Sequence, residues 1–438
     1  MHQSGERPRQ QKALRRYTRG MRGPLLTVAG LLSACICVAA QQVPLAEYQA
    51  RRTELRKALG DAVFVAFGEE ESADNLRSGF FQSSDFYYLT GWNEPGAILV
   101  LTPKDDILLL PRRNEQQEKW TGRKLAPGDP SAQQITGFRI LVAAETFESR
   151  LPEFLSEAEP LYTVHGGLDK LRRLAPLRKV SDASLQIARL RAQKSDAEIA
   201  MIQHSTDVTM EAHRAAWAAI KPGLFEYQVA AVMTGTSLGT GCARVAYAPI
   251  VGSGPNAAVL HYSKNNRRMD SGELLLMDVA AECGMYASDI TRTVPVNGKF
   301  TARQRDLYNV VLGAQKAAIA AIKPGMTIAR DGPNSLNTIA REYMNTHGKD
   351  RSGEPLGKYF IHGLSHHVGL DVHDPSDPSQ PLEAGMVITV EPGLYLPEEG
   401  IGIRIEDVVL VTETGAKVLS AGLPREADEI EKALARPN

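Results

Sequence analysis

Hydrophobic and polar residues alternate in blocks over the first part of the chain. Four short runs rich in aliphatic and β-branched residues are separated by charged stretches with helical spacing: AVFVAF at 62–67, GAILVLT at 96–102, DDILLLP at 105–111 and FRILVA at 138–143. Short runs of this composition, bounded by glycine, proline and charged residues, are typical of strands. The pattern predicts a small α/β domain over residues 44–185.

A different pattern begins after residues 186–193. Ser195-Asp-Ala-Glu198 has the spacing of a capping box and opens a long amphipathic segment that ends at Lys221-Pro-Gly223. The hexapeptide AAIKPG at 218–223 recurs letter for letter at 320–325, 102 residues later, again after a long helical segment. A repeat at equivalent helix ends indicates related units. We therefore expect a second domain over residues 190–430, made of two related α/β halves that face each other across a cleft.

The first 40 residues have the layout of a secretory signal peptide. Residues 1–23 contain seven Lys or Arg and one acidic residue, and residues 24–40 are apolar and end in small side chains. This segment is too short and too early to be a membrane span of the mature chain. Cleavage after Ala40 is expected, with Met21 as an alternative start. A lipoprotein anchor at Cys35 is less favoured, because the apolar run continues beyond it. Export to the periplasm or the extracellular space is predicted.

Composition and charge further restrict the kind of protein that this chain can be. A length of 438 residues and a hydrophobic content of 43% fit a soluble protein of two domains. Without residues 1–40, 43 basic and 50 acidic side chains remain, a formal charge of −7, which argues against a nucleic-acid partner. Cys242 and Cys283 could form one bridge in an oxidising compartment, but two buried free thiols are favoured.

Two aspartates have the spacing of a metal-binding hairpin. Asp278 ends the apolar run 274–277, and Asp289 lies at an equal offset from a turn predicted at 282–285. A hairpin centred there places the two side chains opposite each other, with Cβ atoms about 5 Å apart. Like charges that close repel unless a cation lies between them. A solvated hairpin with two surface aspartates is disfavoured, because no basic residue lies opposite.

Further polar residues follow apolar runs downstream. Glu391 closes MVITV directly before a proline, and Arg404 and Glu406 lie two apart in an alternating strand, so they share one face. The segment HGLSHHVGLDVH at 362–373 packs four histidines into twelve residues. Taken alone, Glu391 or the pair Arg404 and Glu406 is as consistent with an ordinary strand-end or surface residue as with a functional one, and a histidine in such a loop is often only a polar loop residue. Together with the aspartate pair they form an acidic centre, in which His366 supplies nitrogen.

The donor set predicts a binuclear metal site. Four carboxylates, one imidazole and no cysteine suit Mn²⁺ or another hard divalent ion better than a structural tetrahedral zinc, with Zn²⁺ or Co²⁺ as alternatives. Two such ions can lower the pKa of a shared water and polarise a carbonyl. Hydrolysis is the expected reaction, with these metal ligands: Asp278, Asp289, His366, Glu391 and Glu406.

This ordered set resembles the metal ligands of the creatinase or pita-bread metallopeptidases, and the surrounding motifs are similar to those of the aminopeptidase P (Xaa-Pro aminopeptidase) branch. The matching motifs are VGSGPNAAVLHYSKN, DITRTVPVNG, HGLSHHVGLDVHD, VEPGLY and GIRIEDVVLVTE. SSDFYYLTGWNEPGAILVL and EKWTGRKLAPGDPSA resemble the leading domain of that family. Over residues 44–430 the resemblance implies an α/β (α+β) chain: a creatinase-like α/β amino-terminal domain followed by a pita-bread catalytic domain of two pseudo-symmetric halves.

The resemblance also implies roles for the metal ligands. Asp278 would bind one metal, His366 would bind the other, and Asp289 and Glu406 would bridge both. Glu391 would be a ligand and also the proton shuttle, which takes a proton from the bridging water and passes it to the leaving prolyl nitrogen.

Further residues would bind substrate under the same resemblance. His373 would stabilise the tetrahedral intermediate, His261 and His362 would line the pocket for proline, and Arg404 would steady that pocket and reach towards a substrate carboxylate. Asp85 and Trp120 match positions that close the cleft, in some relatives from a neighbouring subunit, which predicts a homodimer or homotetramer.

The implied activity is an exported, metal-dependent exopeptidase that releases the first residue of proline-containing peptides with proline in second place. Xaa-Pro dipeptidases (prolidases) commonly carry a longer loop after the motif that ends at Asp374, with an arginine for the dipeptide carboxylate. No arginine occurs between His373 and Arg404, which favours longer substrates. A prolidase and a non-catalytic pita-bread binding protein are the alternatives, although silent relatives lose metal ligands and this chain retains all five.

Overall fold

The computed structural model describes residues 42–72, 75, 79–155 and 160–435. The predicted signal peptide, with Ala40 and Cys35, lies outside these residues, so that prediction stays open. In the described ranges, no helix combines the length and apolar character that crossing a membrane requires.

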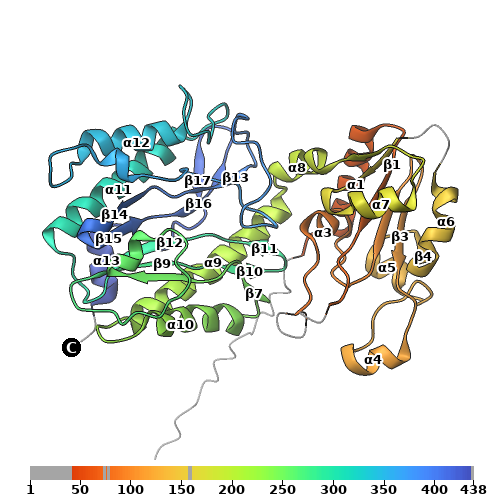
Figure 1. The fold of residues 1–438 in the computed structure, drawn as a ribbon, viewed down its shortest axis with the longest axis horizontal. Coiled ribbons are helices and arrows are strands. Elements are labelled where there is room, and N and C mark those ends of the chain that lie inside the picture. The colour runs from red at the N-terminus through yellow and green to blue at the C-terminus, as the bar shows by residue number, and fades with distance from the viewer. Residues whose placement is uncertain (1–41, 73–74, 76–78, 156–159, 436–438) are drawn as a thin grey trace, which may run out of the picture. The chain divides into compact units, whose positions relative to one another are not determined.

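A six-stranded sheet in the order β4-β3-β2-β1-β5-β6 forms the centre of the first part of the chain (Figure 1). The four predicted strands are confirmed, and two three-residue strands were too short to recognise from sequence. β1, β2 and β3 pair in antiparallel fashion, and the other pairs are parallel. The strands are β1 (Val63–Phe67), β2 (Ile98–Leu101), β3 (Asp106–Leu110), β4 (Ile140–Ala143), β5 (Leu161–Thr163) and β6 (Val180–Asp182).

Helices cover this sheet on both faces. Successive residues of β1 belong to different clusters of the core: Val63 and Val65 pack in one, and Phe64 and Ala66 pack in the other. Because side chains alternate between the faces of a strand, a strand that is apolar throughout must be covered on both sides. The helices are α1 (Leu45–Leu59), α3 (Ser84–Thr90), α4 (Glu115–Thr121), α5 (Ala132–Thr136), α6 (Phe147–Phe154), α7 (Leu168–Leu174) and α8 (Ser184–Ala192).

The second part of the chain begins with the predicted long helix, and its two halves share the same order of helices. α9 (Asp196–Ala219) opens with the capping box of Ser195 and Glu198, and α11 (Ala302–Ala321) opens with an equivalent box of Thr301 and Gln304. Both helices end in the repeated hexapeptide. α9 is followed by α10 (Glu226–Gly239), and α11 is followed by α12 (Leu336–His347). The predicted division into two related halves is confirmed.

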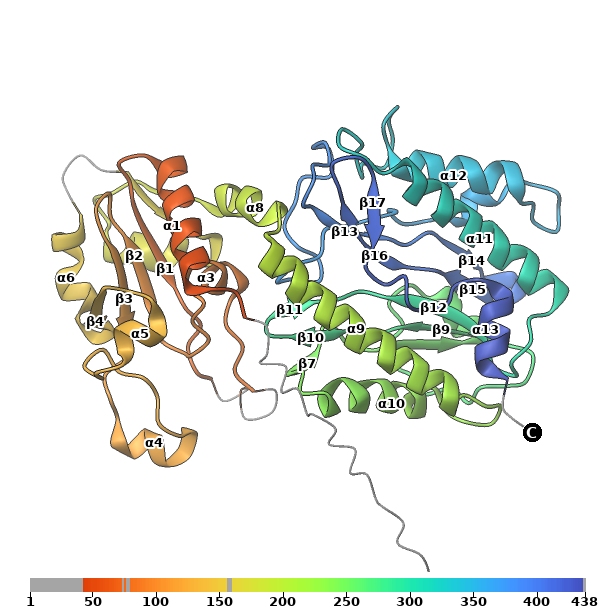
Figure 2. The ribbon, with the colours of Figure 1, turned by 180° about the vertical axis from the view of Figure 1, so that it is seen from behind.

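Each half also contains antiparallel strands. The pair of helices of each half lies on the outer side of these strands (Figures 1 and 2). The first half has sheets β11-β10-β7 and β12-β9-β8, and the second has β13-β16-β17 and β14-β15. The domain limits 44–185 and 190–430 remain predictions. The strands are β7 (Arg244–Val245), β8 (Ile250–Ser253), β9 (Leu274–Asp278), β10 (Ala281–Cys283), β11 (Tyr286–Ala287), β12 (Thr291–Pro295), β13 (Val387–Val390), β14 (Gly393–Leu396), β15 (Ile401–Arg404), β16 (Asp407–Val411) and β17 (Ala416–Val418), and the final helix is α13 (Ala427–Leu434).

The hairpin register differs from the predicted one. Asp278 pairs with Thr291, so Asp289 is displaced by two residues from the position opposite Asp278. The turn falls one residue later than predicted, because Gly284 and Met285 both adopt positive φ, 58° and 72°. Two central residues with positive φ are the requirement of a two-residue type I′ hairpin turn. The prediction of direct opposition was therefore wrong.

Candidate metal centre

The five predicted metal ligands converge from separate strand ends. Asp278 is the last residue of β9, Glu391 follows β13 directly, and Glu406 lies between β15 and β16. These strands are buried throughout, so each carboxylate lies at the end of a buried strand. Asp289 precedes β12, and His366 lies in the irregular segment before β13.

The ligand atoms lie within a few ångströms of one another. His366 Nε2 is 3.3 Å from Asp289 Oδ2 and 3.4 Å from Glu391 Oε1. Single ligand atoms of Asp289, His366 and Glu406 all lie within 4.8 Å of each other. One tyrosine hydroxyl joins the Asp278 carboxylate to the same cluster. The structure thus brings the whole predicted ligand set into one place.

Burial makes this cluster energetically demanding without a cation. Asp278, Asp289 and Glu406 are 8%, 5% and 1% exposed. Burial, followed by the repulsion of neighbouring carboxylates, raises the pKa of Glu406 well above its usual range. Burial likewise raises the pKa of Glu391 to about 7, against the opposing charges of His366 and Arg404. Glu406 Oε1 has no hydrogen-bond partner among the described residues. An oxygen-rich, buried anionic cluster with an orphaned oxygen fits hard divalent cations.

His366 is oriented as a metal ligand would be. Its Nδ1 lies 3.0 Å from the carbonyl oxygen of His367, a contact that requires Nδ1 to carry the proton. In the neutral ring Nε2 then keeps its lone pair and faces the carboxylates. Burial alone would lower its pKa, but the hydrogen bond to Asp289 and the charges of Glu391 and Asp289 raise it to about 9. Without a cation, Nε2 therefore carries a proton at neutral pH, and a bound cation would take the place of that proton. His373 stacks on this ring at 3.9 Å between centroids.

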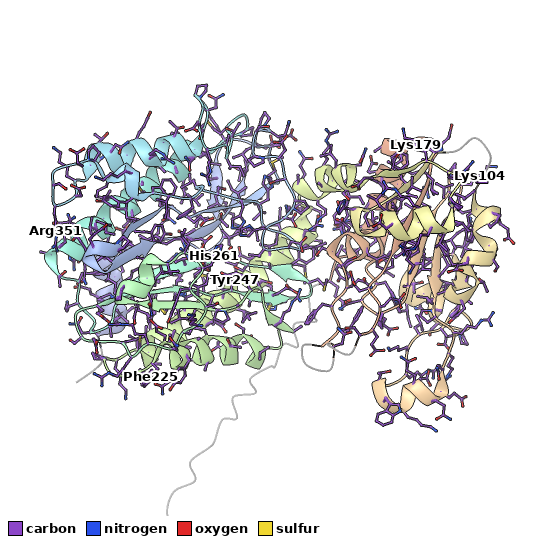
Figure 3. All side chains as sticks on the ribbon, viewed as in Figure 1. Lys104, Lys179, Phe225, Tyr247, His261 and Arg351 are labelled. Carbon is purple, nitrogen blue, oxygen red and sulfur yellow. A yellow bond between two sulfur atoms is a disulfide. The ribbon has the colours of Figure 1, made fainter. Side chains whose placement is uncertain are left out.

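Tyr247 is a site residue that sequence reasoning missed. Its hydroxyl lies 2.5 Å from Asp278 Oδ1 and 2.6 Å from Asp289 Oδ1. With His261 and His373 it lines a cavity of about 290 Å³ beside the two aspartates, and Tyr247 and His261 lie close to each other in Figure 3. Burial and then the charges of Asp278 and Asp289 raise its pKa well above the usual value. No motif marks it, because only the fold of 244–247 against β10 brings it here.

A hydrogen-bonded chain connects the predicted proline pocket to the carboxylates. His362 Nε2 lies 2.8 Å from Tyr395 Oη, Arg404 Nη1 donates to the same hydroxyl at 2.9 Å, and Arg404 Nη2 donates to Asp278 Oδ2 at 2.6 Å. Arg404 is thus bonded to both Tyr395 and Asp278, and its role in a proline pocket stays a prediction. Its side chain is only 3% exposed, so it is badly placed to reach a substrate carboxylate.

The shared face of Arg404 and Glu406 is also observed. Both contact the hydroxyl of Thr291: Arg404 Nε donates to it at 3.1 Å, and the hydroxyl donates to Glu406 Oε2 at 2.6 Å. The two residues do not belong to one continuous strand, because β15 ends at Arg404 and β16 begins at Asp407.

Asp85 and Trp120 do not touch the cluster within this chain. Asp85 Oδ1 accepts from Arg191 Nη1 at 2.7 Å, and Arg191 Nη2 also binds Asp371 and Asp374, which flank the predicted substrate residue His373. Asp85 thus reaches the site only indirectly. Trp120, on α4, is 89% exposed.

The cysteines correct another expectation. Cys242 and Cys283 form a disulfide, with Cα atoms 4.4 Å apart, so the prediction of two free thiols was wrong. The antiparallel pairing of β7 with β10 places the residues next to each other. His204 approaches both sulfurs, but joined sulfurs are not thiolate ligands, so this group is no metal site in the oxidised chain.

Known proteins are similar to this chain in sequence and fold. Residues 200–413 match the family model of metallopeptidase family M24, and residues 48–163 match that of the aminopeptidase P N-terminal domain. The Xaa-Pro aminopeptidases of Haemophilus influenzae and Escherichia coli are 36% and 35% identical, over 90% and 88% of this chain and 98% and 96% of theirs. E. coli aminopeptidase P with the inhibitor Pro-Leu superposes with a TM-score of 0.80 at 32% identity, covering 90% of this chain and 98% of that one. Proline aminopeptidase P II from Yersinia pestis gives 0.81 at 31% identity, covering 90% and 99%.

Fold and site together define a metallopeptidase of family M24, a hydrolase with a pita-bread catalytic domain. Because both domains match along nearly the whole length of these relatives, the chain belongs to the aminopeptidase P family. The predictions of the family, the fold class and a hydrolytic enzyme are confirmed.

Proposed function

We propose that this protein releases the amino-terminal residue from peptides that carry proline in second place. It is a metal-dependent Xaa-Pro aminopeptidase. The observation that carries this function is the buried cluster of four carboxylates and His366, with the cavity lined by His261 and His373 beside it. The relatives named above are Xaa-Pro aminopeptidases, and the dipeptidase alternative is not favoured.

We assign the metal ligands as Asp278, Asp289, His366, Glu391 and Glu406, holding two divalent ions, with Mn²⁺ preferred. Zn²⁺ is an alternative, since a Zn-substituted form of the E. coli relative is known in complex with product. When bound, such ions supply Lewis acidity and lower the pKa of a water.

The remaining steps belong to the side chains of the chain. Glu391 lies between His366 and His362, with its Oε2 3.8 Å from His362 Nδ1, where a carboxylate can hold a proton and pass it to the leaving prolyl nitrogen. His261 and His362 would face the proline ring, and His373 would stabilise charge that develops on the carbonyl oxygen. A prolyl amide has no N–H to donate, so protonation of its nitrogen is required of the enzyme.

Substrates longer than two residues are preferred in this proposal. The sequence has no arginine between His373 and Arg404, and Arg404 is buried. A dipeptide would therefore lack a cation for its carboxylate on these segments, whereas a longer peptide continues outward with an amide.

The experiment uses the chelator-treated, Mn²⁺-restored protein on an Xaa-Pro-Yaa tripeptide and the matching Xaa-Pro dipeptide. We expect cleavage of the tripeptide with little of the dipeptide. Dipeptide-only cleavage would indicate a prolidase, and metal-bound protein inactive on both would indicate a binding protein. His347→Gln, an exposed change outside the site, is the matched control and should retain full activity.

Export is proposed for the cellular location. The disulfide between Cys242 and Cys283 supports it, because structural disulfides persist mainly in oxidising compartments. Amino-terminal sequencing of the mature protein would give Gln41 if cleavage follows Ala40. A lipid-modified Cys35 would indicate an anchor instead.

A homodimer or homotetramer is also proposed. The exposed Trp120 on α4, a helix without buried residues, supports contact with a second copy. Light scattering would measure the assembly. Trp120→Ala should raise KM if the side chain enters the cleft of a neighbour, and an unchanged KM would contradict that role.

A further inference from the structure

Glu226 is a fully buried carboxylate outside the metal cluster. It is 0% exposed and is the first residue of α10, next to Phe225, which is labelled in Figure 3. A buried charge is costly unless hydrogen bonds satisfy it. Among the described residues the side chain forms no ion pair, although the charge of Arg267 attracts it at longer range. Its hydrogen bonds are therefore the direct contacts that stabilise the charge.

Five donors surround this carboxylate. Oε1 accepts from Ser253 N at 2.7 Å, Ser253 Oγ at 2.8 Å and Asn256 Nδ2 at 3.2 Å. Oε2 accepts from Tyr262 Oη at 2.8 Å and Arg267 N at 2.9 Å. Every neighbour donates, so an acceptor-only group is required; an amide would point its NH₂ at other donors.

All five donors lie in one segment, residues 253–267. Glu226 binds both ends of this segment and its middle, and the backbone N–H of Glu226 donates to Arg267 O at 3.0 Å. The middle contact is Tyr262, the residue directly after His261. His261 is itself exposed and lines the cavity beside Asp278. Its position therefore depends on how the segment is held rather than on packing of its own ring.

The spacing of these donors also accounts for residues of the motif VGSGPNAAVLHYSKN that have no part in the metal site. Ser253, Asn256 and Tyr262 turn towards Glu226, while His261 between them faces the cavity. Asn265, at φ 48°, ties the same segment to β8 through Val251 N at 3.0 Å.

We infer that Glu226 is a positioning residue for His261: it holds residues 253–267 so that the imidazole stays at the substrate cavity. Its kinetic readout rests on the proposed function. Because positioning errors of about 1 Å cost up to about a hundredfold in rate, Glu226→Gln should lower kcat/KM for an Xaa-Pro-Yaa peptide by about tenfold to a hundredfold. Tyr262→Phe, which removes one donor, should give a smaller fall.

A double-mutant cycle tests whether Glu226 acts through His261. His261→Ala should reduce kcat/KM, with the effect divided between KM and kcat in the same way as in Glu226→Gln. In the His261→Ala background, Glu226→Gln should have little further effect on kcat/KM. Full additivity, or an unchanged kcat/KM in folded Glu226→Gln, would overturn the inference. If Glu226→Gln does not fold, the cycle with Tyr262→Phe decides in the same way.

Two measurements separate this inference from the proposed function. Metal content should stay equal to that of the parent in Glu226→Gln, and ¹⁵N-histidine NMR should show the His261 ring resonance, assigned with His261→Ala, displaced or broadened. The resonance can be read even if the parent cleaves neither peptide, and an unchanged resonance overturns the inference. Glu198→Gln is the control: it alters another buried glutamate, bonded to Ser195 and Tyr286 and paired with Arg51 at 3.2 Å, and should leave the His261 resonance and kcat/KM unchanged.

Discussion

Removal of the disulfide is the perturbation whose cost follows most directly from the structure. Cys242 and Cys283 are 41 residues apart in sequence. Closing a loop of that length removes chain entropy from the unfolded state worth about 4 kcal/mol at 25 °C. Cys242→Ala with Cys283→Ala should therefore lower the free energy of unfolding by up to about 4 kcal/mol.

The cross-link also bears on the metal centre. Cys283 ends β10, between Asp278 and Asp289 along the chain, and β10 pairs with β7, which leads to Tyr247. Without the cross-link the segments that carry these carboxylates are held by two residue pairs between β7 and β10 and by packing. We expect the double variant to keep the complete ligand set and to be active at saturating metal, but to bind metal more weakly.

The assay is denaturant unfolding followed by tryptophan fluorescence, at fixed metal concentration, with and without a dithiol reductant. The shift in midpoint multiplied by the m value gives the change in stability. Reduced parent should coincide with the double variant, and the variant should not respond to reductant, which controls for Cys35 and Cys37. Equal midpoints for oxidised and reduced parent would refute the reasoning.

Three further predictions concern individual side chains. Glu391→Gln should abolish turnover while far-UV circular dichroism stays that of the parent, and normal hydrolysis would contradict the shuttle role. Asp289→Asn should reduce bound metal measured by atomic absorption after dialysis, and metal content equal to that of the parent would contradict a bridging role. Burial lowers the pKa of His213 to about 3, so between that value and the unfolded value near 6.5 the unfolded state binds one more proton and stability falls with falling pH. By this linkage His213 should lower the free energy of unfolding by roughly 2 kcal/mol at pH 5 relative to neutral pH. His213→Asn should show a smaller difference between denaturation at pH 7 and pH 5, and identical pH dependence would exclude His213 as the cause.

Local pattern was sufficient for much of the fold and for recognising the proposed metal ligands, which the structure brings together. Four strands of the first sheet, the capping box at Ser195 and the repeated helix ends depend on residues within one element, and all are observed. The ligands were recognisable because a carboxylate directly after an apolar strand is conspicuous, as with Asp278 and Glu391. Three-residue strands such as β5 carry too few residues for a periodic pattern, and they were missed.

What the sequence by itself determined is therefore the identity of the longer elements and of the chemical groups at their ends. Only the tertiary structure decided the hairpin register of Asp278, the disulfide, the position of Tyr247 and the donors around Glu226. A strand's alternation specifies which face a side chain occupies but not which strand becomes its neighbour. These features all depend on the pairing of segments far apart in sequence, so they exist only once the chain has folded.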